Sequence, residues 1–148
     1  MNNLNPDTID ATAAGSLLAA ARDARTRSYS PYSGFPVGAA LLDGEGHVHT
    51  GANVENAAYG ISMCAERTAL FHAVASGVSN FVAIAVVGPA EAESCTPCGS
   101  CRQAINEFAP DLPVITSDGS TGYLLTPLSE LLPNAFGPRN LSEARGAR

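Results

Sequence analysis

The chain has 148 residues and a net charge of −6, with 45% hydrophobic and 15% charged residues. This composition is typical of one globular domain, spanning 1–148, that buries roughly 70% of its extended surface. The acidic balance disfavours a nucleic-acid partner, and no apolar run approaches the roughly 20 residues that a membrane span needs. Every basic residue is an arginine, which excludes a lysine Schiff base and a P-loop lysine.

The N-terminus and the cysteines together predict a reducing, cytoplasmic location. The first residues have neither a positive region nor an apolar stretch, so no signal peptide is expected. Four cysteines could form two disulfides in a secreted chain of this size. Because no export signal is visible and Cys98-x-x-Cys101 has the spacing of metal ligands, we expect free thiols in the cytoplasm.

The first third of the chain predicts a helix and then a hairpin. Residues 8–27 carry an apolar stripe at helical spacing, with Thr8 or Asp10 as the cap. After a turn-rich loop, a strand is expected at 35–42. A glycine-rich turn then leads into a second strand at 47–50.

Helices and strands alternate in the remainder of the chain. Helices are expected at 62–76 and 99–108, with a continuous β-branched run between them at 81–87 that indicates a buried strand. The elements expected after these are strands at 113–116 and 123–125, a short helix at 127–132 and a loose tail at 139–148. The pattern predicts an α/β fold of three layers, a mixed sheet with helices on both faces.

Two short segments supply ligands and a base for zinc chemistry. Cys64-Ala65-Glu66-Arg67 stands at the start of one predicted helix, and Pro97-Cys98-Gly99-Ser100-Cys101 at the start of another. Thiolates of Cys64, Cys98 and Cys101 can hold Zn²⁺ and leave its fourth position for water. Helix N-termini favour the thiolate form. A Cys-x-Glu followed by Pro-Cys-x-x-Cys is the pattern of zinc deaminases that act on nucleobases.

Glu66 and Arg67 have separate roles in this hypothesis. Glu66 is expected to move protons beside the metal without ligating it. Positions i and i+2 of a helix point about 200° apart, so Cys64 and Glu66 can serve one ion only if it lies beyond the helix N-terminus. Three thiolates and Zn²⁺ sum to a charge of −1. Arg67, with Arg102 as second candidate, is expected to balance that charge.

The remaining cysteine and the histidines leave alternatives open. Cys95 could complete a closed, structural Cys₄ site, although the neighbouring carboxylate would then stand beside a saturated metal. His47 and His49 share a strand face and could form an H-x-H metal pair, although exposed strand faces often carry histidines without function. His72 lies about 12 Å along the helix from Cys64 and is expected to be a packed or surface residue.

Five segments, in order, resemble those of the small, homotetrameric cytidine deaminases, and they cover the chain from about residue 10 to 138. The segments are Tyr32-Ser33-Gly34-Phe35-Pro36-Val37-Gly38-Ala39-Ala40-Leu41, Asn53-Val54-Glu55-Asn56-Ala57-Ala58-Tyr59-Gly60, Cys64-Ala65-Glu66-Arg67-Thr68-Ala69-Leu70, Pro97-Cys98-Gly99-Ser100-Cys101-Arg102-Gln103 and Leu131-Leu132-Pro133-Asn134-Ala135-Phe136-Gly137-Pro138.

The resemblance implies a five-stranded sheet between helices and a role for each site residue. The implied roles are zinc ligation by Cys64, Cys98 and Cys101, acid/base catalysis by Glu66, binding of the ribose hydroxyls by Asn53 and Glu55, packing of Phe35 on the pyrimidine, contact of the Ala65 backbone with the base edge, entry of Phe136 into a neighbouring subunit's site, and hydrogen bonding of Arg67 to ligand thiolates.

The function that follows is zinc-dependent hydrolysis of cytidine and 2′-deoxycytidine to the uridines and ammonia, in pyrimidine salvage, by a homotetramer with shared active sites. In class, this is a hydrolase of the C–N bond of a cyclic amidine. One alternative is a deaminase of a cytosine-nucleoside antibiotic, which the Asn53-Val54-Glu55-Asn56 segment disfavours. The other is a noncatalytic, zinc-stabilised binding module, which Glu66 and the open three-cysteine site disfavour.

Overall fold

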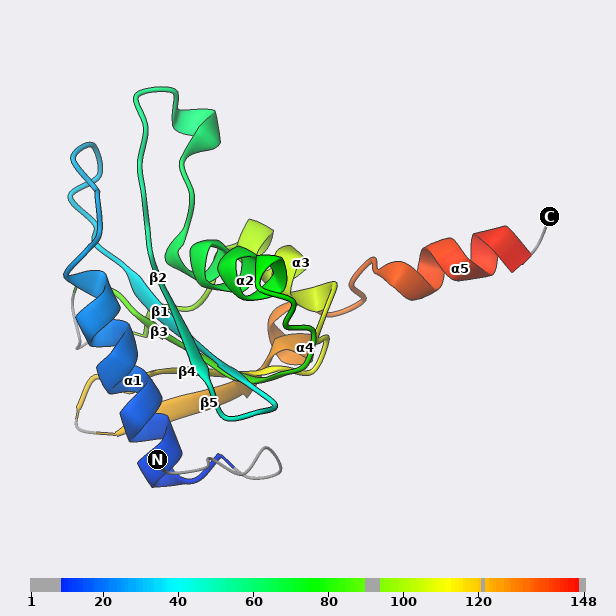
Figure 1. The fold of residues 1–148 in the computed structure, drawn as a ribbon, viewed down its shortest axis with the longest axis horizontal. Coiled ribbons are helices and arrows are strands. Elements are labelled where there is room, and N and C mark those ends of the chain that lie inside the picture. Colours follow the sequence, from blue (N-terminus) through cyan, green and yellow to red (C-terminus); the bar gives the residue numbers. More distant parts are fainter. Residues whose placement is uncertain (1–8, 90–93, 121, 147–148) are drawn as a thin grey trace.

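A five-stranded mixed sheet forms the middle layer of the computed structural model (Figure 1). The structure describes residues 9–89, 94–120 and 122–146. The strands are β1 (Gly38–Asp43), β2 (Val48–Ala52), β3 (Phe81–Val87), β4 (Pro113–Ser117) and β5 (Tyr123–Pro127). Their spatial order is β2-β1-β3-β4-β5, in which β3 and β4 are parallel and the other neighbours antiparallel. The predicted sheet is confirmed, and β3 has the predicted bounds.

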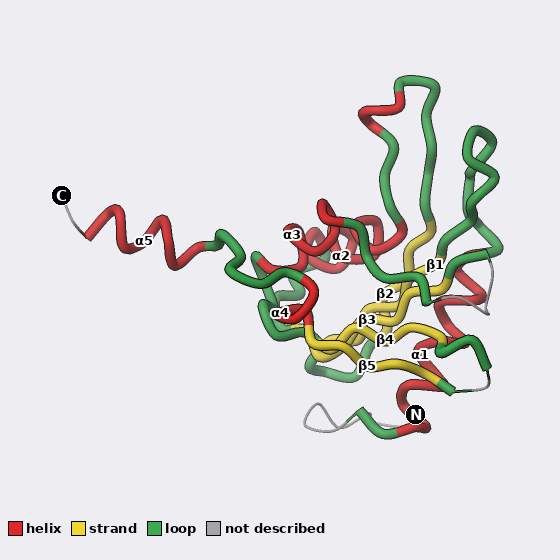
Figure 2. Tube along the Cα trace, turned by 180° about the vertical axis from the view of Figure 1, so that it is seen from behind, coloured by secondary structure: helices red, strands yellow, loops and turns green. Residues whose placement is uncertain are grey.

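Helices cover both faces of the sheet, so the expectation of three layers is also confirmed (Figures 1 and 2). Helix α1 (Ala11–Arg25) covers one face, and α2 (Ala65–Ala75), α3 (Gly99–Asn106) and α4 (Leu128–Leu131) cover the other. Because successive side chains of a strand point to opposite faces, the central strands contribute to two cores. The buried residues under α1 include Leu17, Leu42, Ala85 and Ile115, and those on the α2 side include Leu41, Leu70, Ile84 and Val114.

Helix α1 begins with a side-chain cap. Asp10 accepts a hydrogen bond from the backbone N–H of Ala13 at 2.8 Å, which satisfies one of the donors that a helix start leaves free. Thr8, the other candidate cap, lies outside the described residues. The helix ends at Arg25, two residues before the predicted end, and the arginine side chain donates to the carbonyl of Gly88 at the end of β3.

Strand β1 begins three residues later than predicted, because a side chain occupies the backbone groups that precede it. The carboxamide of Asn53 accepts a hydrogen bond from the N–H of Val37 at 2.8 Å and donates to the carbonyl of Phe35 at 2.9 Å. The segment before Gly38 is therefore held as a loop against Asn53 and does not extend the strand.

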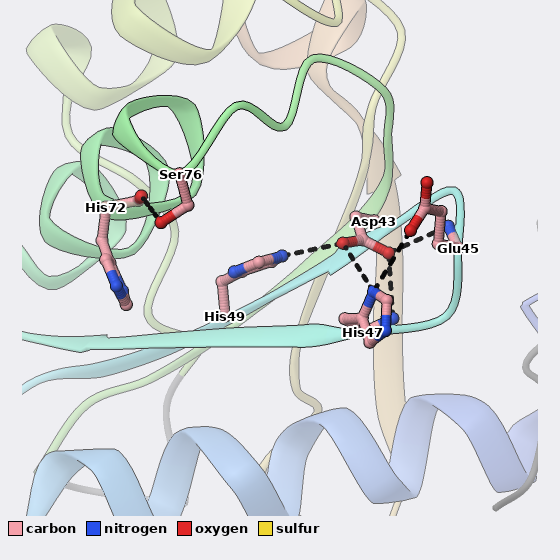
Figure 3. Close-up of polar contacts among 6 residues, drawn as sticks. All are labelled: Asp43, Glu45, His47, His49, His72 and Ser76. Atoms are coloured by element: carbon pink, nitrogen blue, oxygen red, sulfur yellow. Dashed lines mark hydrogen bonds and ion pairs between the residues drawn. The ribbon is translucent and has the colours of Figure 1, made fainter.

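The two histidines of the β1–β2 hairpin, considered above as an H-x-H pair, both face one carboxylate (Figure 3). His49 Nε2 lies 2.8 Å and His47 Nδ1 lies 3.4 Å from the same oxygen of Asp43. The other oxygen of Asp43 accepts the N–H groups of Glu45 and His47, each at 2.9 Å. Asp43 is only 3% exposed, so this carboxylate holds the hairpin turn together. His72 is exposed, with its ring edge-on to that of His49.

Asp43→Ala is expected to destabilise the protein by about 1–3 kcal/mol at neutral pH, because several donors lose a buried acceptor. Burial raises the pKa of Asp43, but the hydrogen bonds from His49 and from the backbone of His47 and Glu45 outweigh it, so the pKa is lowered overall. A carboxylate with a lowered pKa stabilises the fold above its unfolded pKa and loses that effect as the pH falls through the folded value. The difference between the two proteins in urea unfolding should therefore narrow below about pH 4.

A matched control for this measurement is Glu45→Ala. The side chain of Glu45 is 85% exposed in the same turn, and removing it should change the free energy of unfolding by less than about 0.5 kcal/mol. Equal losses in the two variants would contradict the role given to Asp43.

The predicted loose tail is wrong in its secondary structure. Residues Pro138–Gly146 form helix α5, which extends away from the sheet and its covering helices (Figure 1). Proline is favourable at the first position of a helix, and the side chain of Asn140 accepts the N–H of Gly137 at 2.8 Å, just before that position. These two local signals begin the helix where composition alone indicated a polar tail.

Candidate metal centre and active site

The three candidate metal ligands meet because two helices begin at the same place. Cys64 is the N-cap of α2 and Cys98 is the N-cap of α3, both with extended backbone angles, and Cys101 lies in the first turn of α3. Helix α2 lies directly on β2 at Gly51, where a Cβ would collide with the backbone of Ala65. This close approach fixes the start of α2 against the sheet.

The geometry of the three thiols fits a tetrahedral zinc ion. The sulfur atoms of Cys64, Cys98 and Cys101 all lie within 4.8 Å of one another, and those of Cys64 and Cys98 are 3.8 Å apart. Sulfurs bound to one Zn²⁺ at about 2.3 Å in a tetrahedron are about 3.8 Å apart. Among the described residues, this is the only group of three or more cysteine, histidine or acidic side chains with ligand spacing. It leaves out Cys95, as well as His47 and His49.

Hydrogen bonds and the helix ends prepare Cys64 for the thiolate form. The pKa of Cys64 is lowered to about 5, first by the hydrogen bond from Cys101 and then by that from Arg67. Cys101, as the donor in this pair, has its pKa raised. Both N-caps lie at the positive ends of helix dipoles, which also favours negative charge.

Glu66 lies in the first turn of α2 and is only 4% exposed. Its pKa is raised, first by burial and then by the charge of Cys64. Cys64 precedes the helical residues, so the roughly 200° separation between helical positions i and i+2 does not apply to this pair. The carboxyl group and the three thiols therefore line one region, beyond the helix start.

The two candidate arginines have different surroundings. Arg67 Nη2 lies 3.5 Å from the sulfur of Cys64, and the thiols of Cys64 and Cys101 raise the pKa of the guanidinium. Arg102 instead donates to the carbonyls of Pro97 and Leu131, each at 2.7 Å. The structure thus places Arg67 beside the thiols. Arg102 instead stabilises the backbone of the segment that carries Cys98.

A pocket of about 380 Å³ opens beside the thiols and the carboxyl group. Its wall includes Phe35, Asn53, Glu55, Ala65, Glu66 and Cys95. Ala65 is the first residue of α2, where backbone N–H groups have no partner within the helix and can bind a ligand. Phe35 is half exposed in this wall, so an aromatic surface is available for stacking.

Most of the hydrogen-bonding positions of Asn53 and Glu55 are occupied by partners within the protein. Asn53 accepts from Val37 and Ser28 and donates to Phe35, which leaves one N–H. One oxygen of Glu55 accepts the N–H groups of Tyr32 and Ser33, at 2.9 and 3.2 Å.

The other oxygen of Glu55 accepts the hydroxyl of Ser33, which leaves it one free acceptor position. The Ser33 hydroxyl is the largest cause of the lowered pKa of Glu55, followed, among those that lower it, by the N–H of Tyr32. Glu55 therefore remains an anion with room for one further donor.

Two further residues of the site were given no role from sequence, and one predicted residue lies elsewhere. Ser33 orients Glu55, and Ser28 holds Asn53; no local pattern marks either contact, because the partners are more than twenty residues apart. Phe136 does not line the pocket of its own chain. Its side chain is 59% exposed, and its carbonyl accepts from Gln103 and Asn106.

Comparison with known proteins gives matches over most of the chain. The family described as "Cytidine and deoxycytidylate deaminase zinc-binding region" matches residues 12–116. A cytidine deaminase of Sporosarcina psychrophila is 46% identical over 129 residues, which are 86% of this chain and 94% of that protein. One of Halalkalibacterium halodurans is 45% identical over 128 residues, or 86% of this chain and 96% of that protein.

Solved structures agree with this match. The cytidine deaminase of Burkholderia pseudomallei superposes with a TM-score of 0.77 at 48% identity, covering 82% of this chain and 97% of that one. That of Mycobacterium tuberculosis superposes with a TM-score of 0.74 at 36% identity, covering 88% and 99%.

Proposed function

Because this chain belongs to the family of cytidine and deoxycytidylate deaminases, we infer that it is a zinc-dependent hydrolase that converts cytidine to uridine and ammonia. We further propose 2′-deoxycytidine as a second substrate. The observation that carries the proposal is a buried carboxyl group, Glu66, next to three thiols at the spacing of a tetrahedral zinc site.

Cys64, Cys98 and Cys101 would hold the metal, with the guanidinium of Arg67 offsetting the excess negative charge of three thiolates. When bound, Zn²⁺ supplies Lewis acidity that lowers the pKa of a water molecule from 15.7 toward about 7. Proton transfer and binding of the substrate fall to the residues that line the pocket.

Glu66 moves the protons in this proposal. It accepts one proton of the attacking water and delivers it to N3 of the pyrimidine while the oxygen adds to C4. It then takes the remaining proton of that oxygen and passes it to the amine, which leaves as ammonia when the C4–N bond breaks and the C4 carbonyl forms. A catalytic acid/base works best with a pKa near the working pH. The burial that raises the pKa of Glu66 moves it in that direction.

Asn53 and Glu55 would bind a single sugar hydroxyl between them. The free N–H of Asn53 donates to that hydroxyl, and the free acceptor position of Glu55 accepts a hydrogen bond from it. One hydroxyl is enough to satisfy both groups, and the 3′-hydroxyl is common to ribose and deoxyribose. Phe35 packs on the pyrimidine face, and the N–H groups at Ala65 bind the base edge.

Membership of the deaminase family also supports a proposal for the assembly, location and role of the protein. We propose a homotetramer in which the exposed side chain of Phe136 completes a neighbouring subunit's pocket. Pyrimidine salvage in the cytoplasm is the proposed role. No described helix is both long and apolar enough to cross a bilayer.

The test of this proposal is ammonia release by the zinc-loaded protein given cytidine, 2′-deoxycytidine and cytosine in parallel. Both nucleosides should be turned over. Cytosine should be a poor substrate, because it lacks the sugar hydroxyl that the free N–H of Asn53 and the free acceptor position of Glu55 would bind. Efficient turnover of cytosine would contradict the sugar contacts. No turnover of any of the three with zinc bound would overturn the proposed reaction.

A further inference from the structure

Cys95 is the one cysteine that stands outside the group of metal ligands, and it lies in the wall of the active-site pocket. Its side chain is half buried and packs against the core on the α2 side of the sheet. Burial raises the pKa of its thiol, as do the nearby charges of Glu66 and Cys64. The thiol is therefore neutral and serves the pocket as a small apolar surface.

The position of the Cys95 side chain relative to Phe35 follows from Gly88, the residue after β3. A Cβ on Gly88 would lie 3.0 Å from the sulfur of Cys95 and 3.6 Å from Cζ of Phe35. The side chains of Cys95 and Phe35 therefore approach each other beside Gly88. Glu66 and Cys64 lie in the wall of the same pocket. Cys95 therefore adjoins both the aromatic wall and the reacting end of the pocket.

The backbone around Cys95 is held on both sides. The hydroxyl of Ser94 is 2.7 Å from that of Thr116 in β4, and Arg102 binds the carbonyl of Pro97 at 2.7 Å. A segment anchored at both ends cannot easily move away from the pocket. A larger side chain at position 95 must therefore take its extra volume from the pocket itself.

We infer that Cys95 is a specificity-determining residue that sets how large a substituent the pyrimidine can carry at C5. The inference rests on the proposed function, which places C4 at the metal end and Phe35 on the ring. C5 is bonded to C4, so its substituent enters the region that adjoins both. Cysteine has one non-hydrogen atom beyond Cβ and leaves space there, which isoleucine, with three, would fill.

The test compares kcat/KM for cytidine and 5-methylcytidine in the unmodified protein, Cys95→Ala and Cys95→Ile. A methyl group in an apolar pocket changes kcat/KM by about 10–200-fold. Cys95→Ile should lower the ratio of 5-methylcytidine to cytidine by ~10-fold or more, and Cys95→Ala should keep or raise it. Competitive inhibition by 5-methyluridine relative to uridine should change in the same direction, because it reports the fit of the ring without the reaction.

The control is Val74→Ile, which adds a methylene to the same core from α2, outside the pocket. This variant should leave unchanged the kcat/KM ratio of 5-methylcytidine to cytidine and the inhibition by 5-methyluridine relative to uridine. Cys95→Val gives the same comparison if the isoleucine variant does not fold. Equal ratios in the unmodified protein, the alanine variant and the larger variant would overturn the inference. Failure of the unmodified protein to deaminate cytidine would instead overturn the proposed function.

Discussion

Glu66→Gln is expected to lower kcat for cytidine by about 10²–10⁴-fold while zinc stays bound at one ion per chain. Glutamine keeps the shape of the side chain but cannot accept the proton of water or return one to the amine. Glu66 is almost fully buried, so an amide of the same size should preserve the packing of α2. The measurement is steady-state ammonia release, together with the zinc content of the same sample.

The matched control for that experiment is Glu107→Gln, at the exposed C-terminal end of α3. It removes the same charge from the chain and should leave turnover unchanged. A glutamine variant at position 66 with full activity would remove the carboxyl group from the mechanism. Loss of zinc together with activity would show that Glu66 holds the metal site together.

Cys98→Ala is expected to remove zinc from the purified protein and, with it, turnover. Two thiols cannot hold the ion as three do, and the loss of affinity should exceed the roughly 10–100-fold that loss of an outer-shell partner costs. Cys98 is exposed, so its truncation removes little core packing. The measurement is zinc stoichiometry after dialysis against a competing chelator.

Cys95→Ala is the control for the metal experiment and tests the alternative of a closed four-cysteine site. Cys95 lies outside the group of thiols with ligand spacing, so this variant should retain one zinc ion per chain. Similar zinc loss from Cys95→Ala and Cys98→Ala would favour the Cys₄ alternative. Stoichiometric zinc in Cys98→Ala would contradict the assignment of that ligand.

Local patterns were enough to predict the elements around the site. The continuous apolar run at 81–87 gave β3 its bounds, since few other structures bury such a run. Helix α3 begins at the predicted residue, and α2 begins at Ala65, three residues after the predicted start. Both starts carry a cysteine of the motif, so the convergence of two helix starts was predicted as well. The ligand set follows from that convergence, because Cys64 and Cys98 are both N-cap residues.

Contacts between distant segments could not be predicted from such patterns. The late start of β1 depends on Asn53, which binds backbone groups sixteen to eighteen residues away. Glu55 likewise binds residues more than twenty positions away. The two hairpin histidines share the carboxylate of Asp43, a contact that the sequence pattern also did not predict. Each depends on the packed position of a loop, which hydrophobic periodicity does not encode.

The zinc ligands also tie together two separate parts of the chain. Cys64 precedes α2 and Cys98 follows β3, so a metal ion bound to both closes a loop that contains a helix and the central strand of the sheet. Such a reversible cross-link stabilises the folded chain by an amount that grows with the logarithm of the free zinc concentration once the site is filled. The metal-free protein is therefore expected to unfold at a lower urea concentration than the zinc-loaded protein.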